Sequence, residues 1–251
     1  MKIAIITGAS SGLGVEFFKG LQNEALDEIW IIARREERLK EISALYGKIP
    51  TRCIPLDITT RESMTYLCEL LKNESPDIRF LINNAGAGVY GALEGADYIA
   101  QGNMIELNVR SLTEITTIAL PYMSAGAKII NSCSIASFVP NANLTVYSST
   151  KAYVMSFSRG LRYELKKRKI NVTALCPGPM ETEFLAVAGL DNGSSKAFDK
   201  LPRCNPTKTA LGAIKASKKG RAVYTPKGFY KFYRVLSKVL PTSWMLGLAK
   251  T

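Results

Sequence analysis

KIAIITGASSGLG, at residues 2–14, begins as an apolar run and ends in a cluster of glycines. The run over residues 2–7 predicts a buried strand, and a helix is expected from about residue 13 to residue 22. Glycines permit a tight turn, and the free N–H groups at a helix start attract a diphosphate. The residues expected to hold that group are Gly8, Ser10, Ser11, Gly12, Leu13 and Gly14. The alternative is a glycine-rich turn that binds nothing.

The rest of the chain continues the alternation of strands and helices. Further strands are expected over residues 28–33, 52–56, 79–82, 127–132, 171–176 and 222–224, and further helices over residues 35–46, 61–72, 104–123 and about 147–166. This pattern predicts one doubly wound α/β domain over residues 1–251, Rossmann-like, with a mostly parallel seven-stranded sheet and helices on both faces. Residues 183–208 are expected to form a substrate loop or lid, and residues 189–195 to be mobile.

Length and composition narrow the class of protein. The chain has 251 residues, 47% of them hydrophobic, which suits one large domain with a sizeable core. It has no run of 18 apolar residues, and the strand at its start leaves no room for a signal peptide, so a cytoplasmic protein is expected. The five cysteines are scattered and there is no histidine. Reduced thiols and no metal site are therefore the expectation.

The net charge of +12 is concentrated at one end of the chain. Residues 196–251 hold 13 Lys and Arg against one acidic residue, which leaves 20 basic and 20 acidic residues in positions 1–195. Because the larger part is electrically balanced, a nucleic-acid partner is not expected. The basic excess indicates a local role for the C-terminal segment.

Tyr147 and Lys151 are spaced to share one face of a helix. A phenol titrates near 10, and a nearby ammonium favours the phenolate, so Lys151 is expected to lower the pKa of Tyr147. Such a phenol can donate and accept a proton near neutral pH, the work that histidine usually does.

These features together resemble the short-chain dehydrogenase/reductase family, in its short single-domain form. The resemblance runs from Lys2 to about Phe184, on five motifs in order: Thr-Gly-x-x-x-Gly-x-Gly at residues 7–14, Asn-Asn-Ala-Gly at 83–86, Asn108, Ser134 with Tyr147 and Lys151, and Pro-Gly-x-x-x-Thr at 177–182. It implies a catalytic set of Asn108, Ser134, Tyr147 and Lys151. It also implies cofactor contacts from Asn84, Ala85, Gly86, Tyr147, Lys151, Pro177, Gly178 and Thr182, and assembly as a homodimer or homotetramer.

The chemistry of carbonyl reduction gives each of these residues a role. Hydride transfer develops negative charge on the carbonyl oxygen, which needs hydrogen-bond donors and then a proton. Tyr147 is the expected proton donor and Ser134 the second hydrogen-bond donor. By resemblance, Ser134 is chosen over Ser132, because members of the family usually have this serine 13 residues before the tyrosine, as Ser134 and Tyr147 are. By resemblance, Lys151 holds the ribose of the nicotinamide, and Asn108 anchors a water that links Lys151 to a proton relay.

Arg34 and Arg35 follow the second strand, where an acidic residue commonly holds the ribose of NAD. A guanidinium is a good partner for a 2′-phosphate, so the expected cofactor is NADP(H) rather than NAD(H). The alternative is a solvated helix start with internal ion pairs among Arg34, Arg35 and the glutamates that follow. By resemblance to the family, Asp57 and Ile58, after the third strand, are expected to lie at the adenine. Asp57 is also a candidate N-cap of the next helix.

The C-terminal segment, residues 227–250, is basic and amphipathic. Lys227, Lys231, Arg234 and Lys238 form one helical stripe, and the apolar residues fall largely on the other side. Three interpretations stay open: a helix that docks on anionic lipid headgroups, a lid over a hydrophobic substrate, and a terminal helix packed on the core or on a second subunit.

The function expected from all of this is oxidoreduction between a ketone and a secondary alcohol. Residues 138–144 and 183–189 flank the catalytic residues and are largely apolar, so they are expected to line the substrate cleft. A hydrophobic and in some cases anionic substrate follows: a steroid or bile acid, a 3-oxoacyl group or a similar carbonyl. The alternative is a non-catalytic sensor of dinucleotides, which the presence of all four catalytic residues disfavours.

Overall fold

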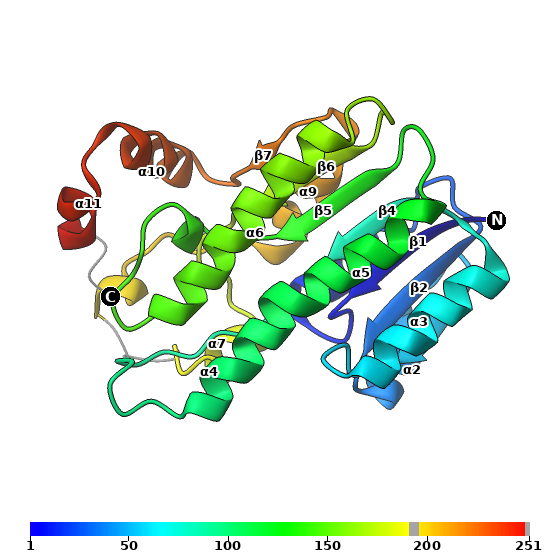
Figure 1. The fold of residues 1–251 in the computed structure, drawn as a ribbon, viewed down its shortest axis with the longest axis horizontal. Helices are drawn as coiled ribbons and strands as arrows, with labels where there is room; N and C mark the ends of the chain where they lie inside the picture. The colour runs from blue at the N-terminus through cyan, green and yellow to red at the C-terminus, as the bar shows by residue number, and fades with distance from the viewer. Residues whose placement is uncertain (191–195, 249–251) are drawn as a thin grey trace.

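A seven-stranded parallel sheet forms the centre of the molecule (Figure 1). The computed structural model describes residues 1–190 and 196–248. The strand order is β3-β2-β1-β4-β5-β6-β7. The strands are β1 (Lys2–Thr7), β2 (Glu28–Ala33), β3 (Thr51–Pro55), β4 (Asp77–Asn83), β5 (Lys128–Ser132), β6 (Asn171–Leu175) and β7 (Val223–Tyr224). The predicted doubly wound, Rossmann-like fold is confirmed, and every strand pair is parallel.

Helices cover both faces of this sheet. On one face lie α3 (Arg61–Glu74), α5 (Leu112–Ala119) and α6 (Thr145–Glu164), and Figure 1 shows α5 and α6 crossing the near side. On the other face lie α1 (Gly12–Leu21), α2 (Glu36–Tyr46) and α9 (Pro206–Lys218). Strands β1 and β2 are largely apolar because both of their faces are buried.

The predicted helix over residues 104–123 is wrong in its start and in its interior. The segment begins earlier as α4 (Tyr98–Ile105), where Asp97 accepts a hydrogen bond from the N–H of Ile99. A π-helical turn over Glu106–Ser111 then joins α4 to α5, and a short 3-10 turn (Leu120–Tyr122) ends it. The π-helical turn holds Asn108, one of the predicted catalytic residues.

Helix α9 was not predicted, although its start has clear signals. Asn205 accepts a hydrogen bond from the N–H of Lys208 at 2.9 Å, and Pro206 occupies the first turn. The predicted lid therefore ends before residue 206. It contains α7 (Glu183–Val187) and α8 (Lys196–Asp199). Part of the loop predicted to be mobile, residues 191–195, lies outside the described residues.

The C-terminal segment forms α10 (Gly228–Val239) and α11 (Thr242–Leu248), which lie at one corner of the molecule in Figure 1. Residues 249 and 250 of the predicted segment lie outside the described part. Within residues 1–190 and 196–248, no helix is long and apolar enough to span a membrane.

The strand order reverses between β1 and β4, and ligands of such sheets bind outside the carboxyl ends of the strands at this point. The predicted site residues follow the ends of β1 to β6, so the fold gathers them at one edge.

Candidate active site

The glycine turn after β1 is fastened to the segment after β4. The hydroxyl of Thr7 accepts hydrogen bonds from the N–H groups of Asn84 and Ala85, each at 3.1 Å. The side-chain amide of Asn84 donates to the carbonyl oxygens of Thr7 and Gly8. Gly8 has φ +65°, and a Cβ there would lie 2.7 Å from the Cα of Ala85. Two motifs that are 77 residues apart therefore make one surface.

The start of α1 meets the segment after β6. Gly12 has φ +48°, and a Cβ on it would lie 3.1 Å from Thr182. Ser11 is the N-cap of α1, and no capping hydrogen bond to its side chain occurs among the described residues. The first N–H groups of α1 thus remain available to an anion. These features fit the diphosphate of a dinucleotide, as the sequence predicted.

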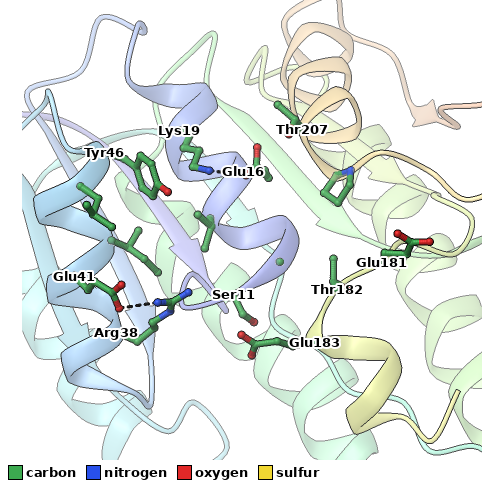
Figure 2. A pocket seen from close by; sticks show the side chains of 15 residues that line it. Ser11, Glu16, Lys19, Arg38, Glu41, Tyr46, Glu181, Thr182, Glu183 and Thr207 are labelled. Carbon is green, nitrogen blue, oxygen red and sulfur yellow. Dashed lines mark hydrogen bonds and ion pairs between the residues drawn. The ribbon is translucent and has the colours of Figure 1, made fainter. Parts of the chain in front are cut away.

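A cleft of about 420 Å³ lies beside this helix start. Figure 2 shows α1 and α2 on one side of the cleft, with Thr182 and Glu183 on the other. Its walls carry the ion pairs Lys19–Glu16 at 2.8 Å and Arg38–Glu41 at 2.6 Å. The cleft is therefore lined by charges of both signs.

Arg35 spans the glycine turn. Its guanidinium donates to the hydroxyl and the carbonyl oxygen of Ser10, and it forms an ion pair with Glu183 at 3.0 Å. The first turns of α2 have ion pairs of their own, but these join Lys40 to Glu36 and Glu37 and do not include Arg35. The interpretation of Arg35 as part of a locally paired helix start is therefore wrong. Glu183 begins α7, so its ion pair with Arg35 joins α7 to the glycine turn.

The positive charge of Arg34 acts on Asp57, which follows the end of β3. Burial raises the pKa of Asp57, but hydrogen bonds from Thr59 and the charge of Arg34 outweigh it, so that the pKa is lowered overall. The carboxylate of Asp57 accepts from the N–H of Thr59 at 3.0 Å and from its hydroxyl at 2.6 Å. The N-cap interpretation of Asp57 is wrong, because Thr60 caps α3 by accepting from the N–H of Ser63. The side chain of Ile58 packs in the core.

Tyr147 lies in the first turn of α6, under an apolar cover. Its ring is 5.9 Å from the ring of Phe184 in α7. The cover is an apolar cluster of buried and partly buried residues around Tyr147: Tyr90, Leu144, Phe184, Leu185, Ala188, Leu190, Phe198 and Leu201. Helix α7 and the residues around it are thus packed over the predicted proton donor.

Burial is the main cause of the pKa shifts of Tyr147 and Lys151. It raises the pKa of Tyr147 to about 12, although the hydrogen bond with Ser134 acts in the opposite direction. Burial also lowers the pKa of Lys151, whose ammonium lies 5.7 Å from the centre of the tyrosine ring. The prediction that Lys151 lowers the pKa of Tyr147 is therefore wrong for this structure. The cause is desolvation, which penalises the charged form of both groups.

Lys151 and Asn108 converge on the segment after β4. Lys151 donates to the carbonyl oxygen of Ser132 at 3.0 Å. The Asn108 amide donates to the Ala87 carbonyl and to the Thr150 hydroxyl, while its oxygen accepts from the Ala87 N–H at 2.9 Å. A Cβ on Gly86 would lie 3.1 Å from Asn108 and 3.2 Å from Lys151. Glycine at residue 86 thus lets both side chains approach the same backbone.

Ser134 and Ser132 take different positions. The hydroxyl of Ser134 accepts from the N–H of Ala136 at 3.1 Å and makes the hydrogen bond with Tyr147. Ser132 lies at the end of β5, as predicted, and donates to the side chain of Asn84 at 3.2 Å.

Cys176 is a free, buried thiol, and burial raises its pKa, so a nucleophilic role finds no support.

Pro177 and Gly178 close the site from the β6 side. The carbonyl oxygen of Pro177 accepts from the N–H of Ile135 at 3.0 Å. A Cβ on Gly178 would lie 2.1 Å from the ring of Tyr230 in α10. The C-terminal helix therefore rests directly on a predicted cofactor segment.

Sequence reasoning missed three contributors to the site. The backbone N–H of Tyr90 donates to the carbonyl oxygen of Ala188 at 2.9 Å, and a Cβ on Gly88 would lie 2.9 Å from Phe184. Gly88 and Tyr90 come shortly after the Asn-Asn-Ala-Gly motif. The aromatic side chain of Tyr90 at this position was the feature of the sequence that could have indicated a role in the site. Glu183 was predicted only as the first residue of the lid. Its ion pair with Arg35 joins residues 148 apart and has no local signature.

A family model described as short chain dehydrogenase matches residues 2–192. The chain belongs to the short-chain dehydrogenase family. It is 32% identical over 203 residues to an uncharacterized oxidoreductase of Staphylococcus saprophyticus, across 79% of this chain and 86% of the relative. The match identifies it as an oxidoreductase of this family.

Solved structures of short-chain dehydrogenases share the fold. One from Sphingobium yanoikuyae, in complex with NADPH, has a TM-score of 0.81 and 22% identity, across 96% of this chain and 97% of that one. One from Burkholderia phymatum, in complex with NAD, has a TM-score of 0.81 and 20% identity, across 94% and 92%.

Proposed function

We propose that this short-chain dehydrogenase interconverts a ketone and a secondary alcohol with NADP(H) as its cofactor. The observation that carries the proposal is the convergence of Tyr147, Ser134, Lys151 and Asn108 beside the glycine turn, at the carboxyl edge of the sheet. The solved relatives in complex with NADPH and with NAD support a nicotinamide dinucleotide. The residues proposed to hold it are Gly8, Ser10, Ser11, Gly12, Leu13, Gly14, Asn84, Ala85, Gly86, Pro177, Gly178 and Thr182, with Arg34, Arg35, Asp57 and Ile58 at the adenosine end.

The chain's own residues supply the proton and the hydrogen bonds. The bound nicotinamide supplies or accepts the hydride. Tyr147, whose pKa is about 12, is protonated near neutral pH and donates its proton to the carbonyl oxygen during reduction. Ser134 donates a second hydrogen bond to the same oxygen. Such donors stabilise the charge that develops there.

Asn108 acts through position. Its amide is held by Ala87 and Thr150, and it keeps the backbone around Gly86 close to the ammonium of Lys151. Lys151 is then available to the ribose hydroxyls and to a water-linked proton relay. The π-helical turn supports this role, because such turns often occur at functional sites.

Two arginines favour NADP(H) over NAD(H). Arg35 lies across the glycine turn, and the charge of Arg34 acts on Asp57. At the end of β2 stands Ala33, so no carboxylate is there to receive a ribose diol. A 2′-phosphate needs cationic hydrogen-bond donors of this kind. Because cellular NADPH pools are usually kept reduced, the proposed direction is carbonyl reduction.

A hydrophobic substrate is proposed from the cover over Tyr147. Phe184, Leu144 and Leu190 pack around the tyrosine ring, so a substrate that reaches the hydroxyl must contact apolar side chains. Steroids, bile acids, 3-oxoacyl groups and similar ketones have such surfaces. Both predicted cleft segments reach Tyr147, residues 183–189 through Phe184 and residues 138–144 through Leu144. Phe138, at the start of the second segment, packs toward Tyr233 instead.

A single substitution tests the reaction. Tyr147→Phe removes the proton donor and keeps the ring, so we expect the rate of NADPH-dependent ketone reduction to fall by about 100-fold or more. NADPH binding, followed by fluorescence titration, is expected to change little. The assay is loss of NADPH absorbance against steroids, 3-oxoacyl thioesters and small aldehydes.

The matched control is Tyr66→Phe, a change of the same kind at an exposed site on α3. We expect its activity to equal that of the wild type. Full activity in Tyr147→Phe would remove this residue from the mechanism, and equal losses in both variants would indicate a general effect of the change.

Assembly as a homodimer or homotetramer through α5 and α6 is also proposed. The outer side of α6 is lined mainly by small and aromatic residues, with one arginine among them, all exposed in the single chain: Ala152, Tyr153, Ser156, Arg159, Gly160 and Tyr163. Such a surface allows two helices to approach closely, and a two-fold axis through it would pair α6 with itself.

A further inference from the structure

Helix α10 is attached to the molecule by one side. Tyr230 is fully buried, packs against Gly178 and donates its hydroxyl to the carbonyl oxygen of Pro202 at 2.9 Å. The ring of Tyr233 lies 6.3 Å from that of Phe138. Met245 anchors the next helix, α11, because it too is fully buried. The tyrosine side of α10 therefore faces the body, which leaves the other sides outward.

A second side of α10 is apolar and faces solvent. Phe229 is 54% exposed, Phe232 65% and Val239 74%, and Trp244 at the start of α11 is 67% exposed. Val235 and Leu246 are exposed as well. We call Phe229, Phe232, Val235, Val239, Trp244 and Leu246 the apolar surface. In α10 its members recur every three or four residues, which places them along one stripe.

A third side of α10 is basic and borders the apolar surface. Lys227, Lys231 and Lys238 follow one another at spacings of four and seven residues, and all three are exposed. No ion pair to any of them occurs among the described residues. From residue 200 to residue 251 the sequence has 12 Lys and Arg and no Asp or Glu. The segment that carries this stripe therefore has no acidic side chain of its own to offset it.

The charge argues against a second copy of the chain as the occupant. Pairing of the apolar surface with itself across a two-fold axis would bring two unneutralised lysine stripes together. Like charges in such an interface are destabilising. An anionic partner with an apolar layer fits both the lysine stripe and the apolar surface. It binds the lysines through its negative charges and covers the apolar side chains.

We propose that α10 and α11 dock the protein on the surface of a membrane that contains anionic lipids. Phe and Trp side chains enter the boundary between headgroups and acyl chains, and the lysines contact the anionic headgroups. Interfacial helices of this kind lie in the membrane plane with aromatic residues on one face and Lys or Arg on the other. This proposal goes beyond the proposed reaction and does not depend on it.

Docking on this surface sets the active site close to the lipid. Tyr230 packs on Gly178 in the segment after β6, and Tyr233 faces Phe138 in the segment after β5. Both segments flank the residues around Tyr147. A docked protein thus holds this side of its site toward the membrane, where hydrophobic ketones partition.

Trp244 makes the test direct. The chain has two tryptophans, and Trp30 is fully buried in the core whereas Trp244 belongs to the apolar surface. The full chain is mixed with vesicles of phosphatidylcholine alone or with about a third phosphatidylglycerol, and both tryptophan emission and flotation are followed. We expect a blue shift and flotation with the anionic vesicles, less with phosphatidylcholine alone, and no blue shift in Trp244→Phe.

Matched variants separate the surface from general effects. Phe229→Ser with Phe232→Ser is expected to weaken binding to anionic vesicles by about tenfold or more. Leu45→Ser with Tyr66→Ser, exposed apolar residues on α2 and α3, is expected to leave it unchanged. Lys231→Glu with Lys238→Glu is expected to abolish the preference for anionic lipid. Lys48→Glu with Lys72→Glu makes the same change of net charge elsewhere and is expected to keep the preference.

Four results would overturn the proposal. The first is a wild-type chain that stays in solution with anionic vesicles, and the second is equal loss of binding in test and control variants. The third is a change of oligomeric mass in Phe229→Ser with Phe232→Ser, which would make the surface a contact between copies. The fourth is a raised KM of that variant for a hydrophobic ketone in the absence of vesicles, which would make it a substrate entrance. Unchanged turnover of a small water-soluble ketone shows that each variant is folded.

Discussion

At the scale of single residues, desolvation decides the acid–base chemistry. Tyr147 is partly buried and Lys151 is buried, and desolvation favours the neutral form of each, so their proximity does not produce a phenolate at neutral pH. The phenol is then ready to donate a proton. This protonation state suits reduction and makes oxidation dependent on alkaline conditions.

The rates in the two directions should therefore depend differently on pH. Reduction requires the phenol, and with a pKa of about 12 for Tyr147 we expect its kcat/KM to stay flat from neutral pH to about pH 9. Oxidation requires the phenolate, so its kcat/KM should rise about tenfold per pH unit over the same range. Steady-state rates in both directions with one alcohol–ketone pair measure this. An oxidation rate that levels off near neutral pH would contradict the raised pKa.

Cofactor choice is the second property to test at this scale. We expect Arg34→Ala and Arg35→Ala each to raise the KM for NADPH by about tenfold and to change the KM for NADH much less. Glu183→Gln should do the reverse and lower the KM for NADPH, because the carboxylate competes with a phosphate for Arg35. The pair is half exposed and worth about 0.2–1 kcal/mol, so the gain should not exceed about fivefold. Equal effects on both cofactors would contradict the NADP(H) preference.

At the scale of elements, the site depends on contacts between segments that are far apart in the chain. Helix α10 is fitted against the segment after β6, and Gly178 is the point of contact, since a Cβ there would lie 2.1 Å from the Tyr230 ring. A side chain at residue 178 would displace a buried tyrosine and, with it, the helix that carries the apolar surface.

Gly178→Ala should therefore destabilise the protein by about 1–3 kcal/mol, the usual cost of overpacking. The matched control is Gly102→Ala in α4, where a Cβ meets no atom within 4 Å and the change should stabilise the helix by up to about 1 kcal/mol. Urea unfolding of both variants measures the difference. If Tyr230 is the obstacle, the cost of Gly178→Ala should shrink in a Tyr230→Ala background.

The elements also show what the sequence could and could not predict. The strands and the glycine turn follow from local patterns, because buried strands and tight turns need particular residues nearby. Asn84, Ser134 and Tyr147 were expected from the resemblance to the family. The π-helical turn at Asn108 has no such pattern, since it is a shift of backbone hydrogen bonds within a continuous helix. Arg35 with Glu183, and Gly178 with Tyr230, are pairings made only by the tertiary fold.

At the scale of the whole molecule, three surfaces have different characters. The carboxyl edge of the sheet carries the site, the outer side of α6 is small and aromatic, and the corner formed by α10 and α11 is apolar and basic. Self-association should use the surface without a concentration of like charge. That surface is the outer side of α6, so assembly and membrane docking need not compete.

Ser156→Glu tests this assignment of the α6 surface. A two-fold axis along α6 would set the two introduced carboxylates close to each other, and their repulsion and desolvation should shift the protein toward monomers. Tyr66→Glu, at an exposed site on α3, adds the same charge elsewhere and should leave the mass unchanged. Light scattering after size-exclusion chromatography measures the mass at several protein concentrations. A wild-type chain that is monomeric at all of them would refute the assembly, and a Ser156→Glu variant with wild-type mass would place the contact on another face.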